Sequence, residues 1–187
     1  APEINKNLIA TDSGFNWNID IIASCQGAKD LDNKIAVSKD AEIGWDKLDR
    51  PEPPQIGEYV TVKFPHEEWE QISKSYCVDV RPSILEGDTW DFEVETNITD
   101  KVNISFDKVN EVPENFEVWL VDPLLKTTKN IRLSSNYVFN SNADGKSKKL
   151  KLLVGNEDFI KKEFAEMQLF PTEFKLHQNF PNPFNPT

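Results

Sequence analysis

Histidine and cysteine are scarce in this chain, and their scarcity limits the chemistry it can support. Its 187 residues include two histidines, His66 and His177, and two cysteines. A serine or cysteine nucleophile needs a nearby base, which is most often histidine. His66 precedes Glu67 and Glu68, so we expect it to stabilise this acidic turn and not to activate a nucleophile.

The motifs of common catalytic sites are also missing. The chain has no G-x-S-x-G, no H-E-x-x-H, no phosphate-binding glycine loop and no dinucleotide fingerprint. Paired carboxylates of the glycosidase kind stay open, but 32 Asp and Glu residues make any single pair uninformative. We therefore predict a domain that is not an enzyme.

Long apolar runs are absent as well. No stretch is long enough for a transmembrane helix, and the N-terminus lacks the basic and apolar regions of a signal peptide. Because residue 1 is Ala, we expect the chain to be processed or cut from a longer protein.

Basic residues are fewer than acidic ones, 21 against 32, and the net charge is −11. That balance disfavours nucleic acid and anionic membrane surfaces as partners. The one basic cluster, Lys146, Lys148, Lys149 and Lys151, alternates with apolar residues and indicates the solvated start of a strand.

The two cysteines, Cys25 and Cys77, leave two alternatives. An exported protein can join such a pair in a disulfide that closes a long loop, with a stabilisation of about 2–4 kcal/mol. Cys25 comes directly after the largely apolar expected strand Trp17–Ser24, and Cys77 follows Tyr76 in another expected strand, which fits two buried free thiols.

Short segments with alternating polar and apolar residues dominate the chain. In the clearest one, Trp90, Phe92 and Val94 alternate with acidic residues, which predicts a strand with one wet face. The expected strands are Trp17–Ser24, Tyr59–Phe64, Tyr76–Val80, Thr89–Thr96, Lys101–Val109, Phe116–Val121, Asn130–Leu133, Asn136–Phe139 and Lys149–Val154. Turn-forming residues separate them, so we predict an all-β fold, an antiparallel β-sandwich of immunoglobulin-like or jelly-roll kind, over residues 1–160.

Residues 26–54 are polar, acidic and rich in proline towards their end, which predicts a long acidic loop. The oxygen donors Asp30, Asp32 and Asn33 are close enough in sequence to turn towards one point, and Asp46 and Asp49 could complete a shell. A hard cation such as Ca²⁺ prefers six to eight oxygen ligands. The loop is therefore a candidate calcium site, with simple solvation of its acids as the alternative.

Four of the five tryptophans divide into two groups. Trp90 and Trp119 stand in alternating strands and are expected in the core, whereas Trp45 and Trp69 stand in polar loops. Exposed aromatic rings on a β-sandwich can stack on sugars. Trp45 and Trp69 are thus candidate ligand-binding residues for a glycan, with plugging of the sandwich end as the alternative.

The C-terminal residues combine proline, asparagine and aromatic rings in an unusual order. The segment runs Gln178, Asn179, Phe180, Pro181, Asn182, Pro183, Phe184, Asn185, Pro186. It resembles the opening of the C-terminal sorting domain of the Bacteroidetes-type (type IX) secretion system, with Phe180 where that family usually has Tyr. The resemblance covers less than a tenth of the chain. It implies an extracellular or outer-membrane location, recognition of the tail by the secretion machinery, and a gene product that continues past Thr187.

These observations give a domain division and a function. We expect a β-sandwich module at 1–160, a linker at 161–171 and a truncated sorting domain at 172–187. The predicted function is a structural, adhesive or partner-binding module of a larger exported protein, whose ligand is another surface protein or a glycan. The alternative is an accessory carbohydrate-binding module of a secreted hydrolase.

Overall fold

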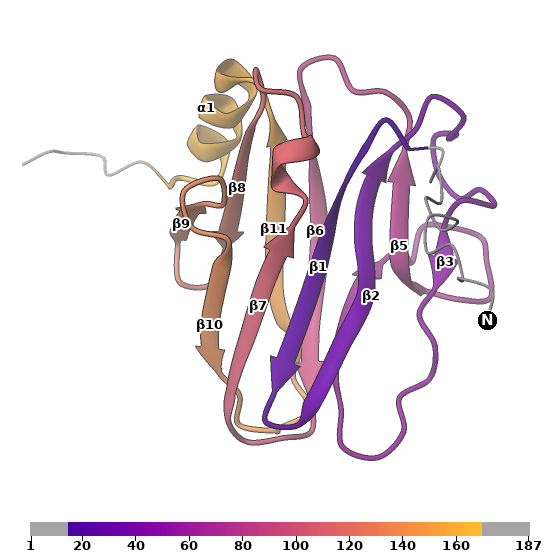
Figure 1. The fold of residues 1–187 in the computed structure, drawn as a ribbon, viewed down its shortest axis with the longest axis vertical. Coiled ribbons are helices and arrows are strands. Elements are labelled where there is room, and N and C mark those ends of the chain that lie inside the picture. Colours follow the sequence, from indigo (N-terminus) through magenta and orange to yellow (C-terminus); the bar gives the residue numbers. More distant parts are fainter. Residues whose placement is uncertain (1–14, 170–187) are drawn as a thin grey trace, which may run out of the picture.

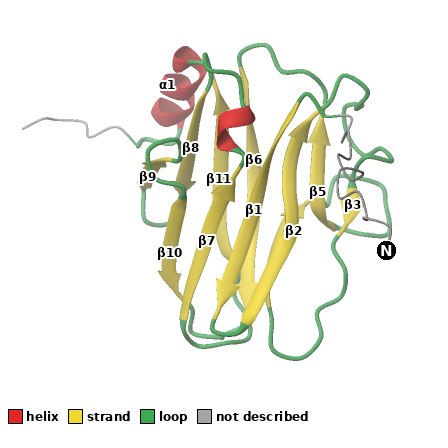
Figure 2. Cartoon of the chain, viewed as in Figure 1, coloured by secondary structure: helices red, strands yellow, loops and turns green. Residues whose placement is uncertain are grey.

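The computed structural model describes residues 15–169 and shows an all-β fold with one α-helix (Figures 1 and 2). The all-β class expected from the alternating segments is confirmed, whereas the expected antiparallel sandwich is not, because the strands form one mixed sheet. The elements are β1 (Trp17–Cys25), β2 (Ala28–Val37), β3 (Arg50–Pro51), β4 (Val60–Pro65), β5 (Ser75–Arg81), β6 (Gly87–Thr96), β7 (Lys101–Asp107), a 3-10 helix η1 (Val109–Glu111), β8 (Glu117–Asp122), β9 (Thr127–Asn130), β10 (Asn136–Asn140), β11 (Lys148–Gly155) and α1 (Glu157–Glu166).

The strands form one large curled sheet in the order β10-β7-β1-β2-β5-β4-β6-β11-β8-β9, and β3 pairs with β5. The sheet is mixed and not purely antiparallel, because β2 and β5 run parallel. Strand β4 joins the two halves, since its last residues pair with β5 and its first residues pair with β6.

The core lies between the two halves of the curled sheet. The ring centroids of Trp17 in β1 and Trp90 in β6 are 6.0 Å apart, and those of Phe92 in β6 and Phe106 in β7 are 6.4 Å apart. All four side chains are buried. Aromatic rings from both halves thus fill the interior, and alternation sends the polar residues of each strand outwards.

The predicted long loop at 26–54 is corrected, because it contains β2 and β3. Strand β2 has a bulge: Ile21 pairs with Asn33 and Ala23 with Asp30, so Ile22 stands opposite both Leu31 and Asp32. A bulge breaks the two-residue period, which hides the strand from a pattern search. The first half of β2 is also largely exposed, which explains its polar composition.

The predicted linker at 161–171 is corrected over its described part, because the boundary at 160 falls inside α1. Asn156 caps this helix by accepting a hydrogen bond from the backbone N–H of Phe159 (2.8 Å). Ile160 is buried against Val121 and Leu153, and Phe164 packs on Trp119 with a centroid distance of 5.3 Å. Helix α1 therefore belongs to the packed body.

Candidate functional site

Three polar side chains form the floor of the candidate site: buried Asp79 and half-buried Arg81 in β5, and buried His66 just after β4. Asp79 and Arg81 are two residues apart in β5 and point to the same face. Arg81 Nη2 lies 3.1 Å from Asp79 Oδ2, and His66 Nε2 lies 2.9 Å from the same oxygen. Burial would raise the pKa of Asp79, but the hydrogen bond from His66 and the charge of Arg81 lower it below its usual value.

Each ring nitrogen of His66 lies within hydrogen-bonding distance of a carboxylate oxygen. Its Nδ1 lies 2.6 Å from Glu68 Oε1, opposite the contact with Asp79. Burial lowers the pKa of His66, but the two carboxylates outweigh burial and raise it. The contact with Glu68 agrees with the expected stabilisation of the acidic turn, and it leaves neither ring nitrogen free to activate a nucleophile in this arrangement.

Aromatic rings cover the His66 ring. Trp69 stacks on it with a centroid distance of 3.6 Å and an interplanar angle of 3°, and Tyr76 packs edge-on against Trp69 at 4.7 Å. A protonated imidazole gains from such stacking because the indole face is electron-rich. The stack fixes the loop between β4 and β5 against the floor.

Arg81 is fixed from the other side by residues of β6. Its Nη1 lies 2.9 Å from Asp88 Oδ1 and donates to the carbonyl of Thr89 at 2.9 Å. Its guanidinium also lies 4.5 Å from the ring centroid of buried Trp90. The guanidinium of Arg81 therefore makes its contacts within the fold and has a structural role.

An open pocket of about 470 Å³ lies over this floor. Its lining comes from the loops that follow β2, β4 and β5. The carboxylate side chains are Glu42, Glu68 and Asp88, and the apolar ones include Ile43, Trp69 and Ile84. Ile43 is 94% exposed, so the rim presents apolar surface to solvent.

The sequence did not single out Asp79, Arg81 or Asp88. A usable signal was present, because Asp79 stands between two valines in an expected strand and Arg81 follows at the next same-face position. A charged residue there is buried and requires a partner.

The predicted calcium ligands on β2 make other contacts. Asp30 Oδ2 accepts a hydrogen bond from the backbone N–H of Val62 (2.8 Å), and Asn33 Nδ2 donates to the carbonyl of Ile21 (3.3 Å). The backbone carbonyl of Asp32 accepts from Arg50 at 2.7 Å. The side chains of Asp30 and Asn33 and the backbone of Asp32 thus hold the bulged strand in place.

The other two predicted ligands organise the loop that follows β2. Asp46 accepts from the backbone N–H groups of Glu42 and Leu48, and Asp49 accepts from those of Asp46 and Val80. Burial raises the pKa of Asp49 to about 6. Within residues 15–169, no three or more His, Cys, Asp or Glu side chains are grouped to hold a metal. Calcium binding stays a prediction.

The four tryptophans named from the sequence occupy different environments. Trp90 is fully buried, whereas Trp119 is half-buried and covered by α1. Trp45 is 44% exposed, and Trp69 is half-buried on His66. Of the two candidate glycan-binding residues, Trp45 offers more of its ring to solvent.

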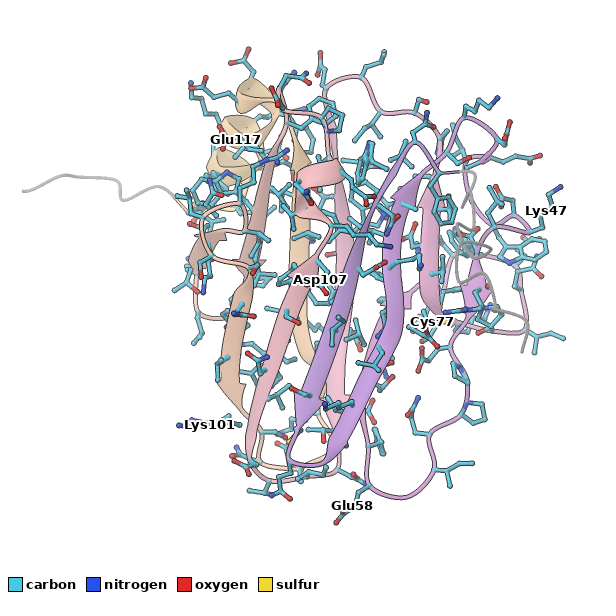
Figure 3. All side chains as sticks on the ribbon, viewed as in Figure 1. Lys47, Glu58, Cys77, Lys101, Asp107 and Glu117 are labelled. Atoms are coloured by element: carbon cyan, nitrogen blue, oxygen red, sulfur yellow. The ribbon has the colours of Figure 1, made fainter. Side chains whose placement is uncertain are left out.

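Cys25 and Cys77 are both buried free thiols. Cys25 faces the main core, whereas Cys77 receives a hydrogen bond from Arg50 Nε at 3.2 Å (Figure 3 labels Cys77 on β5). Burial raises the pKa of each thiol. The predicted disulfide is therefore absent from this structure, and the alternative of two buried thiols describes it.

The sorting motif Gln178–Pro186 lies outside the described residues. Within residues 15–169, no helix has the length and apolar character needed to span a membrane. Comparison with protein-family models, curated proteins and solved structures gave no match.

Proposed function

We propose that this chain is a non-catalytic binding module of a larger protein that is displayed at the outer-membrane surface or released from the cell. The resemblance of Gln178–Pro186 to a type IX sorting motif supports the location. The pocket over His66, Asp79 and Arg81 carries the binding role, because it combines a rigid charged floor with an exposed apolar rim.

The condition of His66 favours binding over catalysis. Its two nitrogens face Glu68 and Asp79, and its ring is stacked on Trp69. An imidazole held between two carboxylates has a raised pKa and a fixed orientation, so it shapes the pocket as a structural group.

The lining favours a cation on an apolar stem, such as a lysine or arginine side chain of a partner protein. Glu42, Glu68 and Asp88 supply negative charge, and Ile43 and Ile84 supply apolar contact. The positive charge of Arg81 is already matched by buried Asp79, which is not part of the lining. The net charge of −11 would also speed the approach of a basic partner.

Nuclear magnetic resonance with a small probe tests this assignment. Adding acetyl-Gly-Lys-Gly-amide should shift the indole N–H resonance of Trp69, assigned through Trp69→Phe, whereas the norleucine peptide should not. Glu42→Gln should weaken binding about threefold to tenfold, since it removes one carboxylate of the lining. Glu58→Gln is the matched control, because Glu58 lies at the far end of the molecule (Figure 3). Equal shifts with both peptides would contradict a cation pocket.

The second candidate is carbohydrate binding, which the exposure of Trp45 favours. A ring that stacks on sugar must be open to solvent. Trp45→Ala should then leave the melting temperature unchanged and reduce retention on insoluble polysaccharides such as cellulose, chitin or xylan. If none of these polysaccharides retains the intact protein, this candidate fails.

A further inference from the structure

Strand β10 ends the sheet and leaves part of its backbone unpaired. It pairs with β7 on one side, and the strand order stops there. The carbonyl of Ser135 accepts from Phe106 and the N–H of Ser141 donates to Asp100, so odd-numbered residues face β7. Because backbone groups alternate along an antiparallel strand, Val138 and Asn140 direct their N–H and C=O groups away from β7. Within residues 15–169, no strand pairs with that edge.

The curl of the sheet brings β10 beside β8 and β9 (Figure 1), and side-chain contacts connect them. Tyr137 Oη donates to Asp122 Oδ2 at 2.6 Å, and Lys129 Nζ donates to the carbonyl of Asn136. Below these contacts lies a groove of about 510 Å³ between β10, the β8–β9 turn and the start of β11. The seam between the two ends of the sheet is thus open along part of its length.

Apolar side chains line this seam. Val138, at the centre of β10, is 53% exposed, and Leu124, in the facing turn, is 82% exposed. Edge strands are usually protected by lysine, proline or a cover, but the sequence of β10, Asn-Tyr-Val-Phe-Asn, has neither residue. An apolar groove beside free backbone groups suits an added strand.

The charge of this region is opposite to that of the chain. Residues 124–151, which include β9, β10 and the start of β11, hold seven Lys or Arg residues against one acid, Asp144, in a chain of net charge −11. Lys148 pairs with Asp122. Lys146 lies 3.3 Å from Asp144 and Lys149 lies 3.5 Å from Glu93, but their side chains stay 84% and 78% exposed and open to a partner. A partner with negative charge would be attracted here and repelled elsewhere.

We propose that the open edge of β10 binds an extended acidic segment of a partner protein, which adds to the sheet as a further strand. Val138 and Asn140 provide its backbone hydrogen bonds. Alternate apolar side chains of the segment enter the groove beside Leu124, and its acidic side chains face Lys146 and Lys149. This surface is separate from the pocket at His66, and neither assignment depends on the other.

Fluorescence anisotropy with a labelled ten-residue peptide of alternating Val and Glu tests the proposal. The protein should bind this peptide, less tightly as salt increases, and should not bind the Val–Lys peptide. Val138→Pro removes the backbone N–H of residue 138, which points away from β7, and leaves every hydrogen bond to β7 in place. An edge strand tolerates proline at such a position. We expect this variant to weaken binding at least about tenfold while the melting temperature stays within about 2 °C. Val138→Thr keeps the N–H and should bind like the wild type.

A second measurement does not depend on the folding of a variant. The Val–Glu peptide with N-methylated backbone amides cannot pair with a strand and should not bind. Equal binding of the N-methylated peptide, equal binding by Val138→Pro, or no binding of the Val–Glu peptide at about 1 mM would overturn the proposal. A dimer in sedimentation that Val138→Pro abolishes would also overturn it, because the occupant would then be a second copy of this chain.

Discussion

At the scale of single residues, burial decides which of the many acidic side chains shape the site. Asp79 is fully buried and must therefore have partners, which His66 and Arg81 provide. Asp30 and Asp46, which the sequence favoured as calcium ligands, accept backbone hydrogen bonds that hold a strand and a loop. Composition does not show which acidic residue belongs to the site and which one holds the backbone, because each role depends on neighbours from distant parts of the chain.

The raised pKa of His66 predicts a pH dependence of stability. A histidine whose pKa is higher in the folded state stabilises fully below its unfolded value of 6.5, and this contribution is lost as pH rises through the folded value. The free energy of unfolding should therefore fall as pH rises above 6.5. Urea denaturation from pH 6 to 9 measures this slope, and His66→Gln should remove it. An unchanged slope in His66→Gln would contradict the assignment.

The calcium prediction is tested at Asp32. If Ca²⁺ binds among Asp30, Asp32 and Asn33, millimolar Ca²⁺ should raise the melting temperature by about 3 °C relative to a chelator. Asp32→Ala should abolish the difference, whereas Asp91→Ala, on the distant β6, should keep it. Identical melting with calcium and with chelator would exclude the site.

At the scale of elements, α1 and β2 show how packing overrides weak local signals. Helix α1 is charged and short, yet Phe159, Ile160 and Phe164 attach it to the sheet. Paired glycines make this possible: Gly87 and Gly155 are opposite each other in β6 and β11, and the Phe159 ring lies directly over both. A side chain at either position would occupy the space of that ring.

Replacing Gly155 should therefore destabilise the protein. A Cβ at this position would lie 2.5 Å from the Phe159 ring and 2.7 Å from the backbone oxygen of Glu86. We expect Gly155→Ala to lower the free energy of unfolding by about 1–3 kcal/mol in urea denaturation. Gly27→Ala is the control, because a Cβ there meets nothing within 4 Å, and it should change stability by less than about 0.5 kcal/mol. Equal effects of the two substitutions would contradict the close packing of α1.

At the scale of the whole molecule, the curled sheet creates two different surfaces. The loops after β2, β4 and β5 enclose an acidic pocket, and the two ends of the sheet leave an open, basic seam at β10. Each surface combines residues that are far apart in the sequence. Opposite charges at the two places favour different partners for each.

The resemblance of the C-terminal residues to a sorting domain predicts that they are not needed for this fold. The core packing described above involves residues 15–169, and the resemblance assigns 172–187 to a separate domain. Deleting 172–187 should therefore leave the melting temperature within about 2 °C. Differential scanning calorimetry measures this change. A loss of several degrees would show that the segment stabilises the body.

The sequence by itself determined the all-β class and the positions of most strands, because alternation with a period of two depends on local order alone. Segments such as Thr89–Thr96 were therefore placed to within two residues, as β6 is Gly87–Thr96. Strand β2 was missed because its bulge interrupts that period, and the docking of α1 was missed because it depends on distant Trp119 and Leu153. The tertiary structure alone decided the buried contacts of Asp79 and the open edge of β10, since each follows from which segments become neighbours.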